Sequence, residues 1–362
     1  MLLEKINILN FKNVRSFEEE FSPKINCFAG MNGVGKTNIL DAIHYLSFSK
    51  SFFNTLDLKN IRHGEDYFAI HGYFRNEKSA DKISCIQKEG NKKLLVANDK
   101  AYKRFSDHIG KYPLIMISPY DRDIINLGSD IRRKFADMVI SQFSQEYLEA
   151  LVLYNKLLIQ RNNLLKQLAD TSSHDFVLIE LLDEQMISYG ELIYQHRKDF
   201  FSKLVPVFQK YFDLISNPNE KVNLEYISQL NDGSFAEQLK ENLQKDLVVK
   251  HSTVGIHKDD IAFYINDFSV KNYASQGQQK SYTIAMKLAQ FEYIKQYTNI
   301  NPILLLDDIF DKLDELRVEN LINLVSNDNF GQVFVTDTHV ERFNEIMRDV
   351  KADMKVFKIE RQ

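Results

Sequence analysis

One eight-residue segment constrains the fold of this chain more than any other. It reads Gly30-Met31-Asn32-Gly33-Val34-Gly35-Lys36-Thr37 and matches the phosphate-loop pattern GxxxxGK[ST] at every fixed position. Glycines let the backbone fold tightly, so that successive N–H groups point inward as an anion nest. The pattern has this meaning only between a strand and a helix. Here Ile25–Ala29 is apolar and Lys36–Phe48 has helical periodicity, so we predict a nucleotide-phosphate site.

The last two residues of this segment have predicted chemical roles. Lys36 is expected to reach the β- and γ-phosphates, and the Thr37 hydroxyl is expected to hold Mg²⁺. The helix that begins at about Lys36 points its positive end at the same phosphates. The backbone from Gly30 to Gly35 would surround the rest of the phosphate chain.

A second segment supplies acidic side chains. Pro302–Leu306 is an apolar run that ends in Asp307 and Asp308, as expected of a buried parallel strand whose tip emerges beside a nucleotide. A strand-end pair of aspartates alone is commonly a turn or a helix cap. Together with the phosphate loop, it predicts that Asp307 binds Mg²⁺ through water and that Asp308 orients the attacking water, because phosphoryl transfer needs mainly positioning and charge compensation. Lys36, Asp307 and Asp308 are therefore the candidate catalytic residues.

A third segment, Ser275-Gln276-Gly277-Gln278-Gln279-Lys280, opens a predicted helix that leads to the acidic strand. A serine hydroxyl, an unhindered glycine and a helix N-terminus together make an anion site, although alone they are an ordinary helix cap. The segment lies about 30 residues before the acid pair, where ATP-binding-cassette (ABC) ATPases carry a signature motif that serves the phosphate bound by a second subunit. We therefore predict that Ser275, Gly277 and Gln278 contact a nucleotide held by a second copy.

The order of elements predicts an α/β fold with an inserted, mostly helical domain. Short strands fill the first third, helical periodicity runs from Ile131 to about Leu214, and the last third alternates helices with strands. We expect the N-terminal part of an ATPase lobe at residues 1–118, with the phosphate loop and antiparallel strands. A helical insertion follows at 119–220, and the C-terminal part, with the signature and the acidic strand, at 221–362. The expected strands are Leu3–Phe11, Val14–Phe21, Ile25–Ala29, Tyr67–Phe74, Lys82–Lys88, Leu94–Ala97, Ile261–Ile265, Pro302–Leu306 and Gln332–Val335. The expected helices outside the insertion are Lys36–Phe48, Gly277–Tyr297, Glu315–Ser326 and Val340–Val350.

Composition restricts the classes of partner. Hydrophobic residues make up 44% and charged residues 27% of the 362 positions, which are ordinary globular values. The formal net charge is −4, so a polyanion must be met by a local basic patch. Two cysteines are too few for a disulfide scaffold and indicate a reducing compartment. No apolar stretch approaches the roughly 20 residues of a membrane span. We expect a soluble, cytoplasmic protein without a membrane partner.

With these segments placed, the chain resembles the RecF family of bacterial recombination and repair ATPases over nearly all of its length. Asn10-Phe11-Lys12-Asn13 resembles the family's Asn/Asp-Phe-Arg-Asn segment, and Ser275–Lys280 is similar to its Ser-Arg-Gly-Gln-Gln-Lys. Gly255–Asp260 departs from Gly-Pro-His-Arg-Asp-Asp at two positions, while Asp311-Lys312-Leu313-Asp314 fits.

The resemblance implies an ABC-type, SMC-like ATPase head, which is a P-loop NTPase, with ATP and Mg²⁺ as cofactors. It implies a homodimer that forms on ATP, binds DNA at single-strand gaps without sequence specificity and hydrolyses ATP slowly as a switch. Recombinase loading, SOS induction and RecR- and RecO-type repair partners are also implied.

Two other classes of ATPase share the three segments. A transport ATPase subunit needs a membrane partner and usually has a shorter gap between loop and signature, whereas 238 residues separate Thr37 from Ser275. The head of another SMC-like or double-strand-break protein carries a far longer coiled coil than two helices of this length supply.

The residues that would contact DNA are the least defined. Between Lys50 and Lys111 there are 13 basic and 8 acidic side chains, a surplus that is as well explained by a solvated face as by polyanion binding. Contact with the DNA backbone needs several cations along one face. The candidates are Lys92, Lys93, Lys103, Arg104, Arg132, Arg133 and Lys134.

Overall fold

The computed structural model describes residues 1–76, 79–170, 176–216, 219–309, 315–327, 329–338 and 352–361. The chain forms two compact units. Unit 1 contains Met1–Arg122, Lys210–Pro218 and Gln276–Gln362, and unit 2 contains Asp123–Gln209 and Asn219–Ser275. Residues 221–275, which the sequence analysis grouped with the ATPase lobe, thus make most of their contacts within unit 2. The functional division into three ranges stays a prediction.

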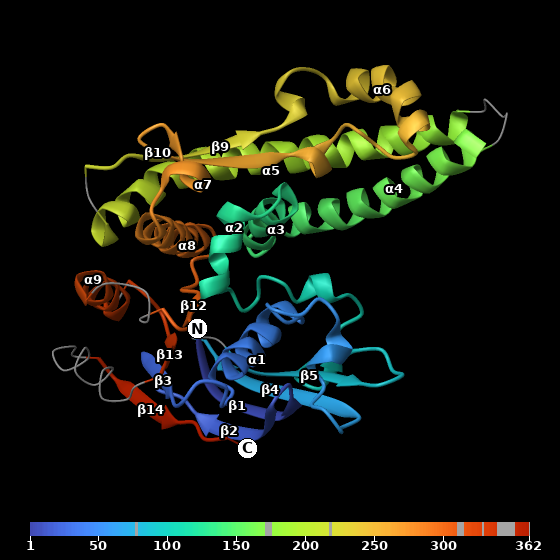
Figure 1. The fold of residues 1–362 in the computed structure, drawn as a ribbon. Helices are drawn as coiled ribbons and strands as arrows, with labels where there is room; N and C mark the ends of the chain where they lie inside the picture. The colour runs from blue at the N-terminus through green and yellow to red at the C-terminus, as the bar shows by residue number, and fades with distance from the viewer. Residues whose placement is uncertain are drawn as a thin grey trace. The chain divides into compact units, whose positions relative to one another are not determined.

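A parallel sheet forms the centre of unit 1. Its order is β14-β3-β13-β12-β8, five strands in the part of the chain that is described. The strands are β3 (Ile25–Ala29), β8 (Leu114–Ile117), β12 (Ile303–Leu306), β13 (Val333–Asp337) and β14 (Met354–Lys358). β3, β8, β12 and β13 consist of buried residues throughout, as expected of parallel strands that are covered on both faces. β13 therefore separates the strand before the phosphate loop from the strand before the acid pair (Figure 1).

An antiparallel sheet of order β2-β1-β4-β5-β6-β7 completes the strands of unit 1. Its strands are β1 (Leu2–Phe11), β2 (Val14–Glu20), β4 (Tyr67–Arg75), β5 (Ala80–Lys88), β6 (Leu94–Ala97) and β7 (Lys100–Ala101). Aromatic side chains pack between the two sheets. The ring centre of Phe17 on β2 lies 6.0 Å from that of Phe28 on β3, and the ring centre of Phe21 lies 4.8 Å from that of Phe334 on β13. Edge-to-face contacts of this kind add to the stability that burial supplies. They fix β3, and with it the start of the phosphate loop.

Three helices complete the described part of unit 1: α1 (Lys36–Phe48), α8 (Gln276–Thr298) and α9 (Glu315–Ser326). α1 contacts β1, β4 and β5 on one side and β8 and β13 on the other, so it lies between the two sheets. This position explains why nearly every side chain of α1 is buried. Short 3-10 turns are η1 (Asp57–Asn60), η2 (Phe105–Asp107) and η3 (Pro119–Arg122).

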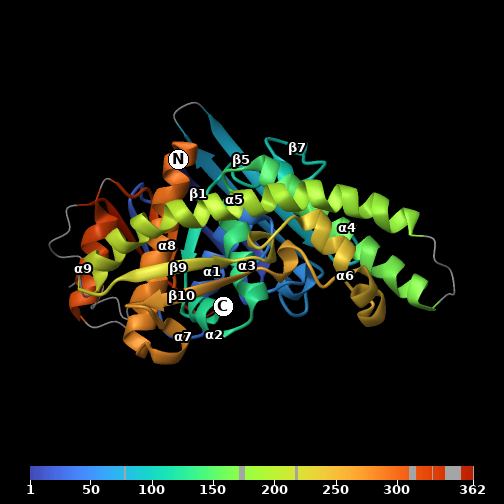
Figure 2. The ribbon, with the colours of Figure 1, turned by 90° about the horizontal axis from the view of Figure 1, so that it is seen from above.

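Unit 2 is built on long helices and a small sheet. The helices are α2 (Asp123–Asn126), α3 (Ser129–Ile140), α4 (Gln145–Asp170), α5 (Val177–Ile215, whose last residues belong to unit 1), α6 (Phe235–Val249) and α7 (Val270–Tyr273). The strands are β9 (Val222–Ile227), β10 (Asp260–Ile265) and β11 (Phe268–Ser269), in the order β11-β10-β9. The remaining turns are η4 (Gln229–Asn231) and η5 (Ile256–Lys258). Figure 2 shows β9 and β10 side by side along α5.

Two buried arginines hold unit 2 together. Arg161 on α4 bonds Asp183 on α5 at 2.5 Å and Asp246 on α6 at 2.6 Å. Arg197 on α5 bonds Asp137 and Asp259, each at 2.8 Å. Buried charges of this kind are tolerated only when they are paired, so each guanidinium fixes the positions of several elements at once.

The predicted elements are confirmed where their residues are described. Lys36–Phe48, Ile25–Ala29, Leu94–Ala97 and Glu315–Ser326 form with the predicted ends, and the other predicted strands and helices differ by one or two residues at an end. The predicted helix Val340–Val350 and the segment Asp311–Asp314 lie outside the described residues. β8, β9, β14 and α6 were not anticipated. Among the helices of the described residues, none is both long and apolar enough to cross a bilayer.

Candidate functional site

The phosphate loop joins β3 to α1, as predicted. Gly33 and Gly35 have φ of 82° and 112°, a region that side chains with a Cβ rarely adopt. At position 30, glycine is required for space, because a Cβ there would lie 2.4 Å from the backbone oxygen of Ile359, which follows β14. Glycine is therefore required at positions 33 and 35 for the backbone conformation and at position 30 for space.

Lys36 lies at the first turn of α1 and its side chain folds back over the loop. Its Nζ donates to the backbone oxygens of Gly30 at 2.6 Å and Met31 at 2.9 Å. The residue is only 7% exposed. The ammonium is therefore held among loop carbonyls, beside the N–H groups that are predicted to bind phosphate.

The acid pair meets the phosphate loop at Asp307, which directly follows β12. Its Oδ1 accepts hydrogen bonds from the hydroxyls of Thr37 and Thr336, both at 2.9 Å. Burial raises the pKa of Asp307 above its usual value, although the hydrogen bonds from Thr37 and Thr336 oppose the rise. The structure thus brings together Thr37 and Asp307, the two residues predicted to hold metal.

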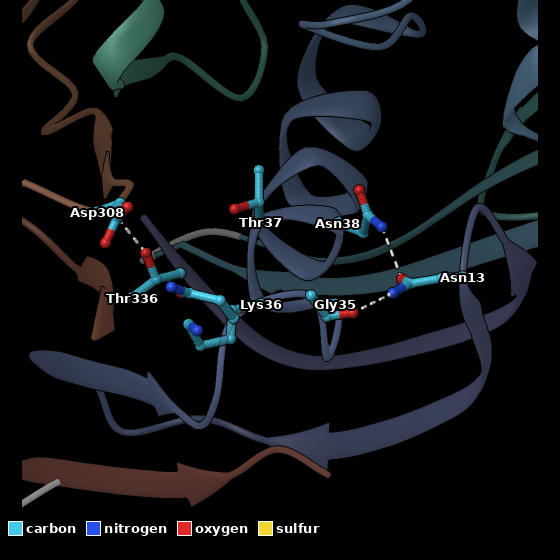
Figure 3. Close-up of a pocket in the computed structure, with 9 residues that line it drawn as sticks. Asn13, Gly35, Lys36, Thr37, Asn38, Asp308 and Thr336 are labelled. Carbon is cyan, nitrogen blue, oxygen red and sulfur yellow. Dashed lines mark hydrogen bonds between the residues drawn. The ribbon is translucent and has the colours of Figure 1, made fainter. Parts of the chain in front are cut away.

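Asp308 turns away from its neighbour and faces a cavity. Its φ of 47° places it in the left-handed region, which aspartate adopts more easily than most residues. Its backbone N–H donates to Thr336 Oγ1 at 2.8 Å (Figure 3). Consecutive aspartates therefore have different surroundings: Asp307 is buried against Thr37, and Asp308 lines open space.

The cavity has a volume of about 140 Å³. Its walls come from the phosphate loop, the start of α1, the ends of β12 and β13, and the turn between β1 and β2. The lining residues are Asn13, Asn32, Gly33, Gly35, Lys36, Thr37, Asn38, Asp308 and Thr336. One lysine, one carboxylate, a threonine hydroxyl and exposed loop backbone can meet a phosphate chain with its metal. Figure 3 shows Asp308 and Thr336 close to Lys36 and Thr37 of the phosphate loop.

The signature segment is placed at the start of a helix, as predicted. Ser275 is exposed and immediately precedes α8, whose first residues include Gly277 and Gln278. Lys280 Nζ donates to the backbone oxygen of Ile309 at 2.7 Å, which ties α8 to the backbone just after Asp308. Ser275, Gly277 and Gln278 are not among the described residues that line the cavity. Their predicted role toward a second copy stays a prediction.

Three of the candidate DNA contacts are engaged in the fold and are not surface cations. Lys93 bonds Asp57 at 2.7 Å and the backbone oxygen of Ser49. Arg132 holds both oxygens of Asp260, at 2.5 and 3.0 Å, and Arg133 bonds the backbone oxygen of Asp259 at 2.7 Å. Counting charges along a sequence does not reveal such pairing. The candidates that remain exposed are Lys92, Lys103, Arg104 and Lys134.

Comparison with known proteins identifies the family. A family model described as "RecF/RecN/SMC N terminal domain" matches residues 2–361. A protein of Bacteroides thetaiotaomicron named DNA replication and repair protein RecF is 47% identical over 361 residues, covering 99% of this chain and 97% of that protein. The chain belongs to the RecF family. A RecF of Flavobacterium johnsoniae is 45% identical, covering 99% of this chain and all of the relative.

Solved structures agree with the RecF assignment. A structure of the recombination mediator protein RecF-ATP in the RecFOR pathway matches with a TM-score of 0.88 and 31% identity, covering 99% of this chain and 97% of that one. The Smc head domain of Pyrococcus furiosus matches with a TM-score of 0.57 at 16% identity, covering 99% of this chain and 94% of that one, which shows a shared fold alone. The predicted family and the predicted ABC-ATPase head with a helical insertion are confirmed.

Sequence reasoning did not identify Thr336, Asn13 or Asn38 as site residues. Thr336 is the last but one residue of β13, and its hydroxyl bonds both the carboxylate of Asp307 and the backbone N–H of Asp308. Asn13 and Asn38 bond each other at 2.6 Å at the edge of the phosphate loop. The one available signal was the position of Asn13 in the segment that resembles the RecF family's early motif.

Proposed function

We propose that this RecF-family chain is an ATP-dependent DNA-binding protein of recombinational repair and replication, which dimerises on ATP and uses slow hydrolysis as a switch. The observation that carries the proposal is the hydrogen bond of 2.9 Å between Thr37 Oγ1 and Asp307 Oδ1. It joins the phosphate loop to the acidic strand across 270 positions of sequence. A glycine turn and a strand-end carboxylate that were unrelated would have no reason to meet.

The phosphates of ATP would bind along the cavity wall that the phosphate loop forms. Backbone N–H groups of the loop and the N-terminus of α1 offer partial positive charge to the phosphate oxygens. The Lys36 ammonium would exchange the carbonyls of Gly30 and Met31 for the β- and γ-phosphate oxygens, because anionic oxygens attract an ammonium more strongly than neutral carbonyls do.

The residues around Asp307 suit magnesium. Hydroxyl, carboxylate and water oxygens are the ligands that this ion prefers, and Thr37 and Asp307 present two of them side by side. Burial raises the pKa of Asp307, and a cation beside it would favour the ionised carboxylate. Bound magnesium would neutralise charge on the β- and γ-phosphates.

Asp308 is placed to act on water. It lines the same cavity as Lys36, and its backbone N–H donates to Thr336. A carboxylate held there can orient a water for attack on the γ-phosphate and accept its proton. Asp308 is the one carboxylate among the described residues that line the cavity, so a weak ATPase is expected of one protomer.

Dimerisation would complete the site. Ser275 is exposed at the N-terminus of α8, where its hydroxyl and the helix dipole can meet the γ-phosphate on a second copy. DNA would bind the dimer by backbone contacts at gaps or junctions, because no base-reading module is evident in the sequence. We also propose RecR- and RecO-type partners and recombinase loading, which the solved recombination mediator RecF of the RecFOR pathway supports. SOS induction and a cytoplasmic location are proposed from the family alone.

Calorimetry and sedimentation with ATP and Mg²⁺ test the proposal. Lys36→Ala should abolish ATP binding. Asp308→Asn should bind ATP, hydrolyse it slowly and remain dimeric for longer. Ser275→Arg should bind ATP as a monomer and fail to dimerise. Wild-type ATP affinity in Lys36→Ala would contradict the loop assignment, and an Asp308→Asn variant that stays monomeric with ATP would contradict the shared site.

DNA binding needs its own measurement. Fluorescence anisotropy with gapped, single-stranded and duplex DNA, with and without ATP, should show ATP-dependent affinity that falls steeply with salt. DNA affinity that is the same with and without ATP would contradict the switch.

A further inference from the structure

Asn13 contacts the phosphate loop from outside it. It follows β1 in the tight turn to β2, and its Nδ2 donates to the backbone oxygen of Gly33 at 3.0 Å. Its Oδ1 accepts from Asn38 Nδ2, on the first turn of α1, at 2.6 Å. Figure 3 shows Asn13 reaching from its own strand toward Asn38 at the edge of the cavity. One carboxamide thus joins the loop to the helix that follows it.

The turn that carries Asn13 is fixed on both sides. Lys12 has φ of 55°, its N–H donates to the backbone oxygen of Asn60, and its Nζ lies 2.6 Å from the buried carboxylate of Asp41 on α1. Arg62 donates to the backbone oxygen of Asn13 at 2.8 Å. The Asn13 side chain is therefore presented by a rigid turn and is not a mobile surface group.

The fit between Asn13 and the loop is close. A Cβ at Gly35 would lie 2.7 Å from Asn13 Oδ1, too near for real atoms. The glycine of the motif at this position therefore leaves room for Asn13, in addition to providing its φ of 112°. The carboxamide occupies the space that a side chain on Gly35 would take.

We propose that Asn13 is a positioning residue that holds the phosphate loop in its phosphate-binding shape. In a trans peptide the carbonyl and the next N–H point in opposite directions. By fixing the carbonyl of Gly33, Asn13 fixes the direction of the N–H of Val34, one of the groups predicted to bind phosphate. Because an anion nest needs successive N–H groups to converge, a loop that has lost this bond presents fewer of them at a time. This inference rests on the proposed binding of ATP.

Four single variants of the full chain separate the bonds. Asn13→Asp keeps the acceptor for Asn38, loses the donor to Gly33 and adds a negative charge. Asn13→Ala loses both bonds, and Asn38→Ala loses only its own. The matched control is Asn7→Ala, because Asn7 lies in the same hairpin, on β1, and donates to Glu18 on β2 at 3.0 Å, with no part in the cavity lining.

Dissociation constants of ATP and ADP, measured by calorimetry, report the effect. A neutral hydrogen bond is worth about fivefold in affinity, so Asn13→Ala should weaken both nucleotides by about tenfold or more, and Asn38→Ala by less. Asn13→Asp should be at least as weak as Asn13→Ala, and its extra deficit should shrink with salt, because the added charge repels phosphate. Asn7→Ala should bind like wild type. A purely structural role for Asn13 would lower the melting temperature without this salt-dependent difference.

Two failures are distinguishable. If Asn13→Ala and Asn13→Asp bind ATP as tightly as wild type while Lys36→Ala does not bind, the inference about Asn13 is wrong and the proposed function stands. If wild type itself binds no ATP, both are wrong. An equal loss in Asn7→Ala and Asn13→Ala would also overturn the inference, because it would show a general effect of weakening the hairpin.

Discussion

Thr336→Val is the most direct test of how the acidic strand end is held. Valine has nearly the shape of threonine but neither donates nor accepts a hydrogen bond. The substitution removes the bond from Thr336 Oγ1 to Asp307 Oδ1 and the bond that Thr336 Oγ1 accepts from the N–H of Asp308. Asp307 keeps its bond from Thr37. One change therefore loosens both acids while the phosphate loop keeps its own contacts.

The expected effect of Thr336→Val on hydrolysis follows from the charge on Asp307. A hydrogen bond to a charged group contributes about 1.5–3 kcal/mol, and one pKa unit corresponds to about 1.4 kcal/mol. Removing the Thr336 bond should therefore raise the pKa of Asp307 further, on top of the rise that burial already causes. Because a carboxylate must be deprotonated to bind metal, magnesium-dependent hydrolysis should need a correspondingly higher pH.

The assay is single-turnover phosphate release as a function of pH, over the range in which the protein stays folded. The acid limb of the Thr336→Val profile should move to higher pH, so that the rate at a given pH on that limb falls about tenfold or more. The rate on the plateau should also fall because Asp308 is less well fixed. Thr336→Ser keeps the hydroxyl and should retain the wild-type limb. A Thr336→Val profile that superimposes on the wild-type profile would refute the assigned role of Thr336.

Three further predictions concern the pH dependence of stability, the buried arginine of unit 2 and the first glycine of the phosphate loop. Burial lowers the pKa of three histidines, His44, His108 and His257, to about 4. Because these histidines have a pKa of about 6.5 in the unfolded chain, the free energy of unfolding should fall as the pH drops from about 6.5 toward 4, by about 2 kcal/mol per histidine at pH 5. The urea midpoints of wild type and His108→Gln at neutral and acidic pH should show a smaller loss in the variant, and an equal loss would contradict the assignment. Arg161→Met should lower the free energy of unfolding by about 3–5 kcal/mol because it leaves the buried Asp246 and the half-buried Asp183 without their cation. Lys250→Met, which breaks an exposed pair, should cost less than about 1 kcal/mol in the same urea titration. Gly30→Ala should weaken ATP binding by about tenfold or more in calorimetry, because its Cβ must push against the Ile359 backbone; unchanged affinity would show that the strand end yields.

Local pattern was enough to predict the elements that carry the motifs. Ile25–Ala29 and Lys36–Phe48 have the predicted ends. The glycines of the phosphate loop mark the end of the strand and the start of the helix, and the hydrophobic period changes between them. The pairing partners of a strand are not written in its own residues. Ile261–Ile265 was predicted as a strand in the range assigned to the C-terminal part of the ATPase lobe, and no pairing partner was predicted for it. In the structure it lies in β10 and pairs with β9 in a sheet of unit 2.

Charge patterning was a weaker guide than the motifs. Lys93 and Arg132 were candidates for DNA contact because they belong to basic stretches. Their carboxylate partners, Asp57 and Asp260, come from other elements, at sequence separations of 36 and 128 positions. A surplus of cations in a stretch of sequence predicts a basic surface only after such pairs have been removed, and the fold decides which pairs form.

The order of the parallel strands explains why Thr336 could not be recognised from its sequence neighbourhood. β13 pairs with β3 on one side and with β12 on the other. The ends of these three strands therefore meet at one edge of the sheet, although 270 positions separate Thr37 from Asp307. Of these three strands, β13 lies between the other two. A short hydroxyl side chain near its end can therefore reach Asp307 and the backbone of Asp308 together. Thr37 bonds Asp307 from the side of the loop, and Thr336, the last but one residue of β13, bonds both Asp307 and the backbone of Asp308.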